Sequence, residues 1–224
     1  MAIILNIETS TKNCSVSLSK EGQVLYSKEL NTGSYSHAEM LHPLIDECLK
    51  EMNLSYNELS AVCVGKGPGS YTGLRIGVST AKGLCFANNT SLIAVNSLEI
   101  LARACSIEEG TIIPLIDARR MEVYSAVFSH NYNWIRETNA EIVDENSFKE
   151  YLDKGPVYFL GDGAEKCKTI ITHKNANFLE DLFPSAIQMG NLSATKYKSS
   201  NFEDVAYFEP YYLKDFVVTP QKKK

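Results

Sequence analysis

The hydrophobic and polar positions in the first half of the chain switch between the period of strands and the period of helices. Short apolar runs and stretches with a two-residue period predict strands, and apolar residues three or four apart predict helices. The pattern Ser36-x-x-Glu39 is typical of a capping box, and Pro43 should kink the helix that this box opens. The predicted elements are strands at 3–8, 14–19, 24–30, 61–64 and 91–96 and helices at 36–52, 73–87 and 97–105, the last capped by Ser97.

The second half repeats this order with different residues, although no repeat is visible at the level of individual residues. Beyond Lys174 the pattern weakens, but 185–197 has the spacing of one more helix. Ser147-x-x-Glu150 is a second capping candidate. The predicted elements are strands at 111–117, 122–128, 134–143 and 157–160, a turn at 161–163, and helices at 144–152 and 164–172.

Strands that are connected through helices pair mainly in parallel, with helices over the sheet and a hairpin at its edge. The predicted fold class is therefore α/β, with two lobes that each have the order strand-strand-strand-helix-strand-helix. We place the N-terminal lobe at 1–105, a shorter C-terminal lobe at 106–220 and a basic tail at 221–224.

Composition and charge exclude several classes of protein. The 224 residues are 44% hydrophobic and 22% charged, which is ordinary for a soluble globular protein. No apolar run approaches the roughly 18 residues of a membrane span, and no secretory signal opens the chain, so we expect a cytoplasmic protein. The six cysteines include no C-x-x-C pair, which favours reduced, buried thiols over zinc ligands. The net charge of −5 argues against a protein that binds nucleic acid unaided.

Two segments of the first lobe have the composition of a phosphate-binding site. A carboxylate and small hydroxyl side chains end the first strand, where turn amides can hold a metal-bound phosphate. The later stretch GPGSYTGLR combines glycines, capping hydroxyls and an arginine in the first turn of a helix, although it is neither a P-loop nor G-x-G-x-x-G. A polar turn and a structural strand-to-helix turn explain these segments as well, so both interpretations stay open. The candidate residues are Glu8, Thr9, Ser10, Gly67, Gly69, Ser70, Thr72, Gly73 and Arg75.

The second long helix has small residues on one face, with Gly77 in its interior. A mid-helix glycine costs about 1 kcal/mol relative to alanine, so we expect another backbone to pack closely there, from this chain or from a partner. The same helix narrowly misses the G-x-S-x-G nucleophile elbow, because Ser79 lies in mid-helix, and a serine hydrolase is not expected.

Two histidines and the end of the first strand of the second lobe are weaker candidates for a functional site. His37 and His42 are five positions apart, which turns them about 140° apart on a helix, too far to chelate one metal ion. We expect both histidines at the surface or facing a partner. Asp117 ends the first strand of the second lobe, as Glu8 does in the first, but the large Arg119 follows where a phosphate turn needs a small residue. This segment is predicted to be an exposed hairpin.

Several segments together resemble the TsaB family, also called YeaZ. They are ILNIETST, HAEMLHPLID, GKGPGSYTGLRIG, AVNSLEILA, PLIDARRMEVYSAVF, FLGDGA and EPYYLK. The resemblance spans nearly the whole chain, is densest from 1 to 130, and has its most specific piece in GPGSYTGLRIG. It implies the actin-like ATPase, sugar-kinase and Hsp70 (ASKHA) fold. It also implies a partner of the TsaD subunit, which makes threonylcarbamoyladenosine next to the anticodon of tRNAs that read codons beginning with A.

The resemblance implies further partners. TsaD transfers the threonylcarbamoyl group, the ATPase TsaE docks on the pair, a TsaB chain alone forms a homodimer, and tRNA is reached through the complex. TsaD holds its metal with two histidines four residues apart, and the second falls here at Leu41, so the resemblance implies no metal ligand and no catalytic residue. ATP or ADP with magnesium at the subunit interface is the one cofactor to consider. The implied partner surface, on helices 36–52 and 74–87, consists of Met40, Leu41, Leu44, Ile45, Gly77, Val78, Ala81 and Leu84.

Two alternative functions stay open. An active ATPase or small-molecule kinase of the same fold predicts that the Glu8 turn and the 67–73 loop bind ATP and magnesium. A glycoprotease-like peptidase is the other, but the chain offers neither a nucleophile elbow nor a metal pair for it.

Overall fold

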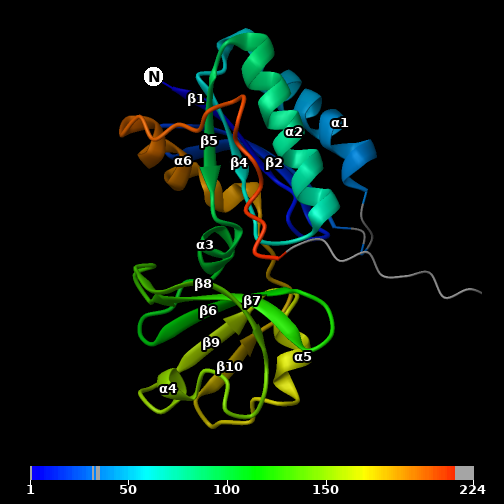
Figure 1. Cartoon of the computed structure of the whole chain (residues 1–224). Coiled ribbons are helices and arrows are strands. Elements are labelled where there is room, and N and C mark those ends of the chain that lie inside the picture. Colours follow the sequence, from blue (N-terminus) through cyan, green and yellow to red (C-terminus); the bar gives the residue numbers. More distant parts are fainter. Residues whose placement is uncertain (1, 32, 34–35, 215–224) are drawn as a thin grey trace, which may run out of the picture.

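Two five-stranded sheets, with a short helix between them, form the frame of the protein (Figure 1). The computed structural model describes residues 2–31, 33 and 36–214, and the predicted tail at 221–224 lies outside them. The strand orders are β3-β2-β1-β4-β5 and β10-β9-β6-β7-β8, so the second sheet repeats the first. Strands β1, β2 and β3 pair antiparallel with one another, as do β6, β7 and β8. The pairs β1–β4, β4–β5, β6–β9 and β9–β10 are parallel. The predicted α/β class and its repeated topology are confirmed.

The first sheet contains β1 (Ile3–Glu8), β2 (Cys14–Lys20), β3 (Gln23–Leu30), β4 (Ala61–Gly65) and β5 (Ser91–Val95). The alternation predicted for β2 is present, but both of its faces are buried. Val16 and Leu18 belong to the main core, whereas the serines on the other face bond to the chain that covers them. The Ser17 hydroxyl donates to the Ala186 carbonyl at 2.7 Å, and the Ala186 N–H donates to the Ser15 hydroxyl at 2.9 Å.

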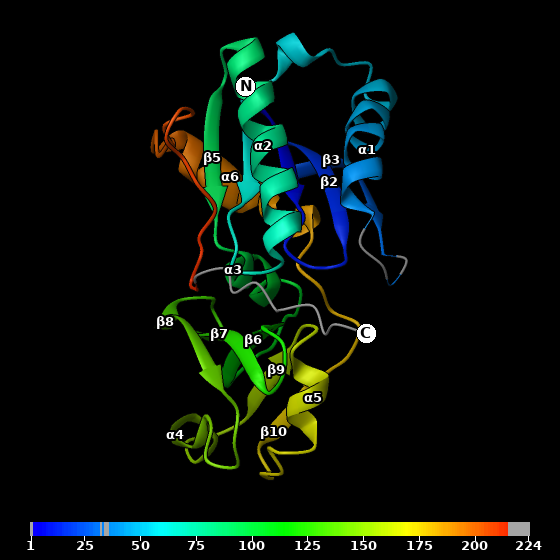
Figure 2. The ribbon, with the colours of Figure 1, turned by 45° about the vertical axis from the view of Figure 1, so that its right-hand side comes forward.

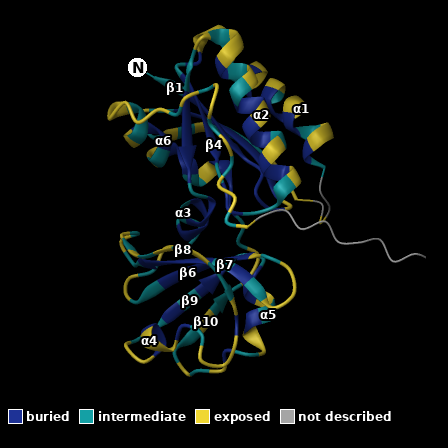
Figure 3. Cartoon of the chain, in the orientation of Figure 1, coloured by how far each residue is buried: buried dark blue, intermediate teal, exposed yellow. Residues whose placement is uncertain are grey.

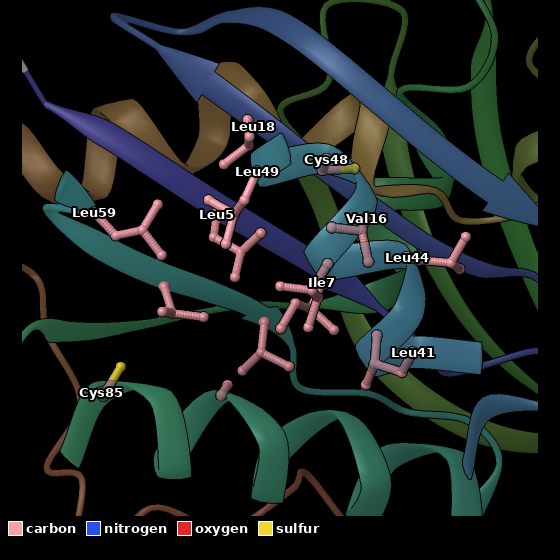
Figure 4. Close-up of a cluster of buried hydrophobic side chains, with 14 of the residues drawn as sticks. Leu5, Ile7, Val16, Leu18, Leu41, Leu44, Cys48, Leu49, Leu59 and Cys85 are labelled. Carbon is pink, nitrogen blue, oxygen red and sulfur yellow. The ribbon is translucent and has the colours of Figure 1, made fainter. Parts of the chain in front are cut away.

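Two long helices, α1 (His37–Glu51) and α2 (Tyr71–Asn88), cover one face of the first sheet, with the 3₁₀ turn η1 (Tyr56–Glu58) between them (Figure 2). Their inner side chains meet those of the strands in the main core (Figure 4). Ser70 caps α2 by accepting from Gly73 N–H at 3.3 Å, and this cap starts the helix two residues earlier than predicted.

Two capping predictions are wrong in this lobe. Ser36 occupies the N-cap of α1, but its side chain makes no capping hydrogen bond, so the predicted capping box is absent. In the short helix α3 (Ser97–Ala102) the cap is Asn96, whose side chain accepts from Leu98 N–H at 2.8 Å. The Ser97 hydroxyl is used inside the candidate site instead.

The second sheet contains β6 (Thr111–Asp117), β7 (Glu122–Ser129), β8 (Trp134–Ile142), β9 (Val157–Leu160) and β10 (Ala176–Leu179), with α4 (Lys149–Leu152) and α5 (Ala164–Lys168). Strand β10 was not predicted. Helix α4 keeps only the last turn of the predicted 144–152, because Ser147 bonds back to Asp144 instead of capping a helix.

The chain returns to the first sheet after β10. The turn η2 (Ala186–Gln188) and helix α6 (Met189–Lys198) cover the face opposite α1 and α2, where Met189 packs with Ile4 and Ile93. Residues 203–214, which we call the C-terminal strap, then run beside β5 and α2. The strap begins where Glu203 N–H donates to the Leu92 carbonyl at 2.8 Å. Residues predicted for the second lobe therefore pack on the first sheet, and the division into domains stays a prediction.

Candidate functional site

Glu8 ends β1 as a fully buried carboxylate. Its Oε1 accepts from Ser10 N–H at 2.6 Å, and its Oε2 accepts from the Ser97 hydroxyl at 3.0 Å. Ser97 also accepts from Gly67 N–H at 3.2 Å, so it connects the carboxylate to the glycine loop. Burial raises the pKa of Glu8, and the hydrogen bonds from Ser10 and Ser97 oppose that rise.

The two segments predicted to hold a phosphate, the turn after β1 and the 67–73 loop, lie in contact. Their polar groups form hydrogen bonds with each other. The Ser10 carbonyl accepts from Ser70 N–H at 2.7 Å, and a Cβ on Gly69 would overlap that same carbonyl. The Thr9 hydroxyl donates to the Gly73 carbonyl at 2.9 Å. Both oxygens of Glu8 are likewise engaged within the chain. These bonds are typical of a strand-to-helix junction, while the Ser10 hydroxyl is buried there with no hydrogen-bond partner among the described residues. Phosphate binding at this turn stays a prediction.

Arg75 does not point into the loop. Its guanidinium lies 4.3 Å from the centre of the Tyr71 ring, and its Nε donates to the Tyr212 hydroxyl at 3.3 Å. The rings of Tyr71 and Tyr212 are themselves 5.3 Å apart. Arg75 thus ties the first turn of α2 to the C-terminal strap, while Thr72 beside it is exposed. The contact joins residues 137 positions apart, so no local pattern predicts it.

A cleft of about 1,050 Å³ separates this junction from the second sheet. Ser70 and Thr72 line one wall, and Asp117, Arg119 and Arg120 line the other. Asp117 accepts from Arg119 N–H at 2.9 Å and pairs with Lys166, so its carboxylate is engaged as well. The segment forms the exposed hairpin that was predicted.

The predicted partner surface needs correction. Leu41, Leu44, Ile45, Val78 and Ala81 are buried in the main core of this chain, and Gly77 is buried beside them. A Cβ on Gly77 would overlap the Thr9 hydroxyl, so the close backbone that the glycine requires is internal. Met40 and Leu84 are half-buried. Figure 3 shows that other residues form the exposed outer faces of α1 and α2. On α2 these are Thr72, Arg75, Ser79, Gly83, Phe86 and Ala87.

His37 is buried, contrary to the prediction, whereas His42 is exposed as predicted. The Nε2 of His37 lies 2.7 Å from the Thr11 carbonyl, and its ring packs against Gly73. Residue 41, where the resemblance puts a second metal ligand, is the buried Leu41. Among the described residues, no three His, Cys, Asp or Glu side chains gather as metal ligands would. His37 thus connects the start of α1 to the turn after β1, where Thr11 lies, and to the first turn of α2, where Gly73 lies.

We expect the protein to lose stability in acid because of His37. Burial lowers the pKa of His37, so the unfolded chain takes up a proton at a higher pH than the folded chain. The neutral ring contributes its full stability above the unfolded-state pKa of about 6.5. This contribution declines as the pH falls toward the pKa of the folded state. Urea unfolding across this range measures the slope. His37→Gln should flatten it and His42→Gln should not; equal slopes in all three proteins would contradict the assignment.

Comparisons with known proteins agree with the resemblance in the sequence. The family model described as "TsaD: tRNA N6-adenosine threonylcarbamoyltransferase" matches residues 31–219. The "tRNA threonylcarbamoyladenosine biosynthesis protein TsaB" of Escherichia coli is 30% identical over 226 residues, 96% of this chain and 95% of the relative. The protein of the same name from Haemophilus influenzae is 28% identical over 225 residues, 96% of this chain and 94% of the relative.

A solved structure extends the comparison to the fold. YeaZ from Pseudomonas aeruginosa superposes with a TM-score of 0.78 at 25% identity, over 95% of this chain and 100% of the other. Among the described residues, none of the helices combines the length and the apolar character that a membrane crossing needs.

Proposed function

Because the chain belongs to the TsaB (YeaZ) family of tRNA threonylcarbamoyladenosine biosynthesis proteins, we propose that it is the non-catalytic partner subunit of a TsaD paralogue. The observation that carries the non-catalytic role is the closure of the 67–73 loop on the turn after β1. There the Glu8 carboxylate accepts from Ser10 N–H and the Ser97 hydroxyl, and Ser70 N–H donates to the Ser10 carbonyl, so these groups hold the two segments together. We expect this work to take place in the cytoplasm.

The partner surface that we propose is the outer face of α2 with the adjoining outer face of α1. Its small residues, Ser79 and Gly83, are exposed, and nothing lies within 4 Å of a Cβ built on Gly83. Phe86 stands at one end with 84% of its surface exposed. An exposed aromatic ring beside small residues allows another helix to approach closely and bury the ring, as at the anchors of protein interfaces. The same face would form the homodimer of the isolated chain.

The direct test is to purify the chain with its TsaD paralogue, TsaE and unmodified tRNA and to measure threonylcarbamoyladenosine in digested tRNA. We expect modification only when this chain is present. Modification that proceeds unchanged in its absence would refute the proposal. A stable complex of the two chains without TsaE, seen by size-exclusion chromatography, would support direct pairing.

Glu8→Gln separates a structural role of this residue from a catalytic one. An amide keeps an acceptor for Ser10 N–H and a polar partner for Ser97, so we expect tRNA modification to continue at a near-normal rate. An ATPase or kinase that uses Glu8 to hold magnesium would lose its activity. Calorimetry with ATP and magnesium on the isolated chain tests nucleotide binding itself.

The same variant should change the pH dependence of stability. The folded chain holds the Glu8 proton to a higher pH than the unfolded chain, so stability declines as the pH rises from about 4.5 toward the folded value. Glu8→Gln should remove this decline.

A further inference from the structure

A second cavity lies at the junction of the two sheets, apart from the cleft beside the glycine loop. Its volume is about 330 Å³, at the lower end of the roughly 300–1,000 Å³ of small-molecule sites. Lys66 after β4, Glu99 on α3, Lys196 on α6 and Tyr211 of the strap line it from the side of the first sheet. Trp134, Glu137 and Thr138 of β8 line it from the second lobe. Figure 1 shows α6, α3 and β8 on the side of the junction away from α5.

Two lysines and two carboxylates, Glu99 and Glu137, line the cavity, and Arg103 beside it adds a third positive charge. The side chain of Glu99 is only 18% exposed, and its Oε1 lies 3.7 Å from Arg103 Nη2. Burial raises the pKa of Glu99, and the charges of Arg103, Lys196 and Lys66 oppose that rise. Within the described part of the chain, neither lysine forms an ion pair, and Lys66 Nζ stands 5.8 Å from the centre of the Tyr211 ring. Arg103 balances Glu99, so the two ammonium groups face the remaining carboxylate, that of Glu137, with one positive charge in excess.

The walls of the cavity are aromatic and fixed in place. The Trp134 ring packs on Phe128, with 4.4 Å between the ring centres. The Tyr211 backbone is held where its N–H donates to the Lys66 carbonyl at 2.7 Å. Asn96 Nδ2 donates to the Thr138 hydroxyl at 2.8 Å and so connects the two lobes across the cavity. A ligand would thus meet two preformed aromatic surfaces.

We propose that this cavity binds a nucleoside monophosphate, either free or as the end of an RNA chain. Lys66 and Lys196 supply charge for the phosphate, as ammonium groups do at phosphate sites. Glu99 and Thr138 supply oxygen acceptors for the ribose hydroxyls, the role that a carboxylate plays in dinucleotide sites. Trp134 and Tyr211 supply faces on which a base stacks, which is sequence-tolerant. Apart from Tyr211, which lines both the cleft and this cavity, no residue of the cleft or of the outer α2 face takes part, so the proposal does not depend on the proposed function.

Trp134 is the only tryptophan of the chain, so its fluorescence reports on this cavity alone. AMP is the probe, and inorganic phosphate and adenosine are the partial ligands. We expect saturable quenching by AMP, confirmed by calorimetry, and binding at least about ten-fold weaker for either part alone, because each part makes only some of the contacts. Absence of both quenching and heat with millimolar AMP would overturn the proposal, as would equal binding of AMP and adenosine.

Lys196→Gln and Lys198→Gln form a matched pair of variants on α6. Lys196 lines the cavity, whereas Lys198 lies outside it and pairs with Glu21 at 3.5 Å. We expect Lys196→Gln to weaken AMP binding about ten-fold, with little change for Lys198→Gln. Equal effects of the two substitutions would mean non-specific attraction and would overturn the proposal. Competition by a short RNA with a terminal phosphate would identify an RNA end as the ligand, and no competition would identify the free nucleotide.

Discussion

Replacing Gly77 with alanine is expected to destabilise the protein by a net of about 1 kcal/mol, although alanine is the better helix former. A Cβ at this position would overlap the Thr9 hydroxyl, which cannot move aside without breaking its hydrogen bond to the Gly73 carbonyl. Overpacking of this kind typically costs about 1–3 kcal/mol, and the gain in helix propensity, about 1 kcal/mol, offsets part of it. Urea unfolding at constant pH measures the difference.

Gly83→Ala is the matched control, because it makes the same change on the same helix. Nothing lies within 4 Å of a Cβ built on Gly83, so this variant should gain up to about 1 kcal/mol from helix propensity alone. Thr9→Ala should recover part of the loss in a Gly77→Ala background, and a double-mutant cycle would show the coupling. If both alanine variants were stabilising, α2 would not be docked on the turn after β1 in solution.

Sequence patterns predicted most of the frame because its strands and helices follow local periods. They did not predict the side-chain contacts between elements that are far apart in the sequence. The glycine at position 77 indicates a close neighbour, but whether that neighbour is Thr9 of the same chain or another subunit depends on a contact 68 residues away. Arg75 likewise violates the preference of a helix start for acidic residues, and its reason, Tyr212, lies at the other end of the chain.

The candidate phosphate site shows the same limit. The structure brings its two segments together, because strand ends and helix starts meet at one edge of a parallel sheet. Composition could not show that Ser97, from a third segment, completes the hydrogen bonding of Glu8. Short helices such as α4 were overestimated because a polar turn, held by Ser147 and Asp144, has the same residue types as a helix start.

Ser79→Arg is expected to abolish the complex with the TsaD paralogue and to reduce tRNA modification to the level without this chain. Ser79 is exposed at the centre of the outer face of α2, between Arg75 and Gly83. A long cation there would hold an approaching helix away and add to the charge of Arg75. We expect the dissociation constant to rise by about 100-fold or more, the equivalent of about 2.7 kcal/mol. An exposed substitution changes folding stability by only about 0.5 kcal/mol, so the variant should remain folded.

Ser106→Arg makes the same change at an exposed loop position outside α1 and α2, and it should leave both assembly and modification intact. An arginine at the nearby Ala81 would not test the partner surface. Ala81 is buried in the core, so that substitution would unfold the chain wherever the partner binds. Light scattering, analytical ultracentrifugation and the tRNA assay on the same samples connect assembly to function. If the Ser79→Arg variant bound the paralogue as tightly as the chain without the substitution, the outer face of α2 would not be the partner surface. Assembly that survives together with lost modification would instead place the contribution of this face in a later step.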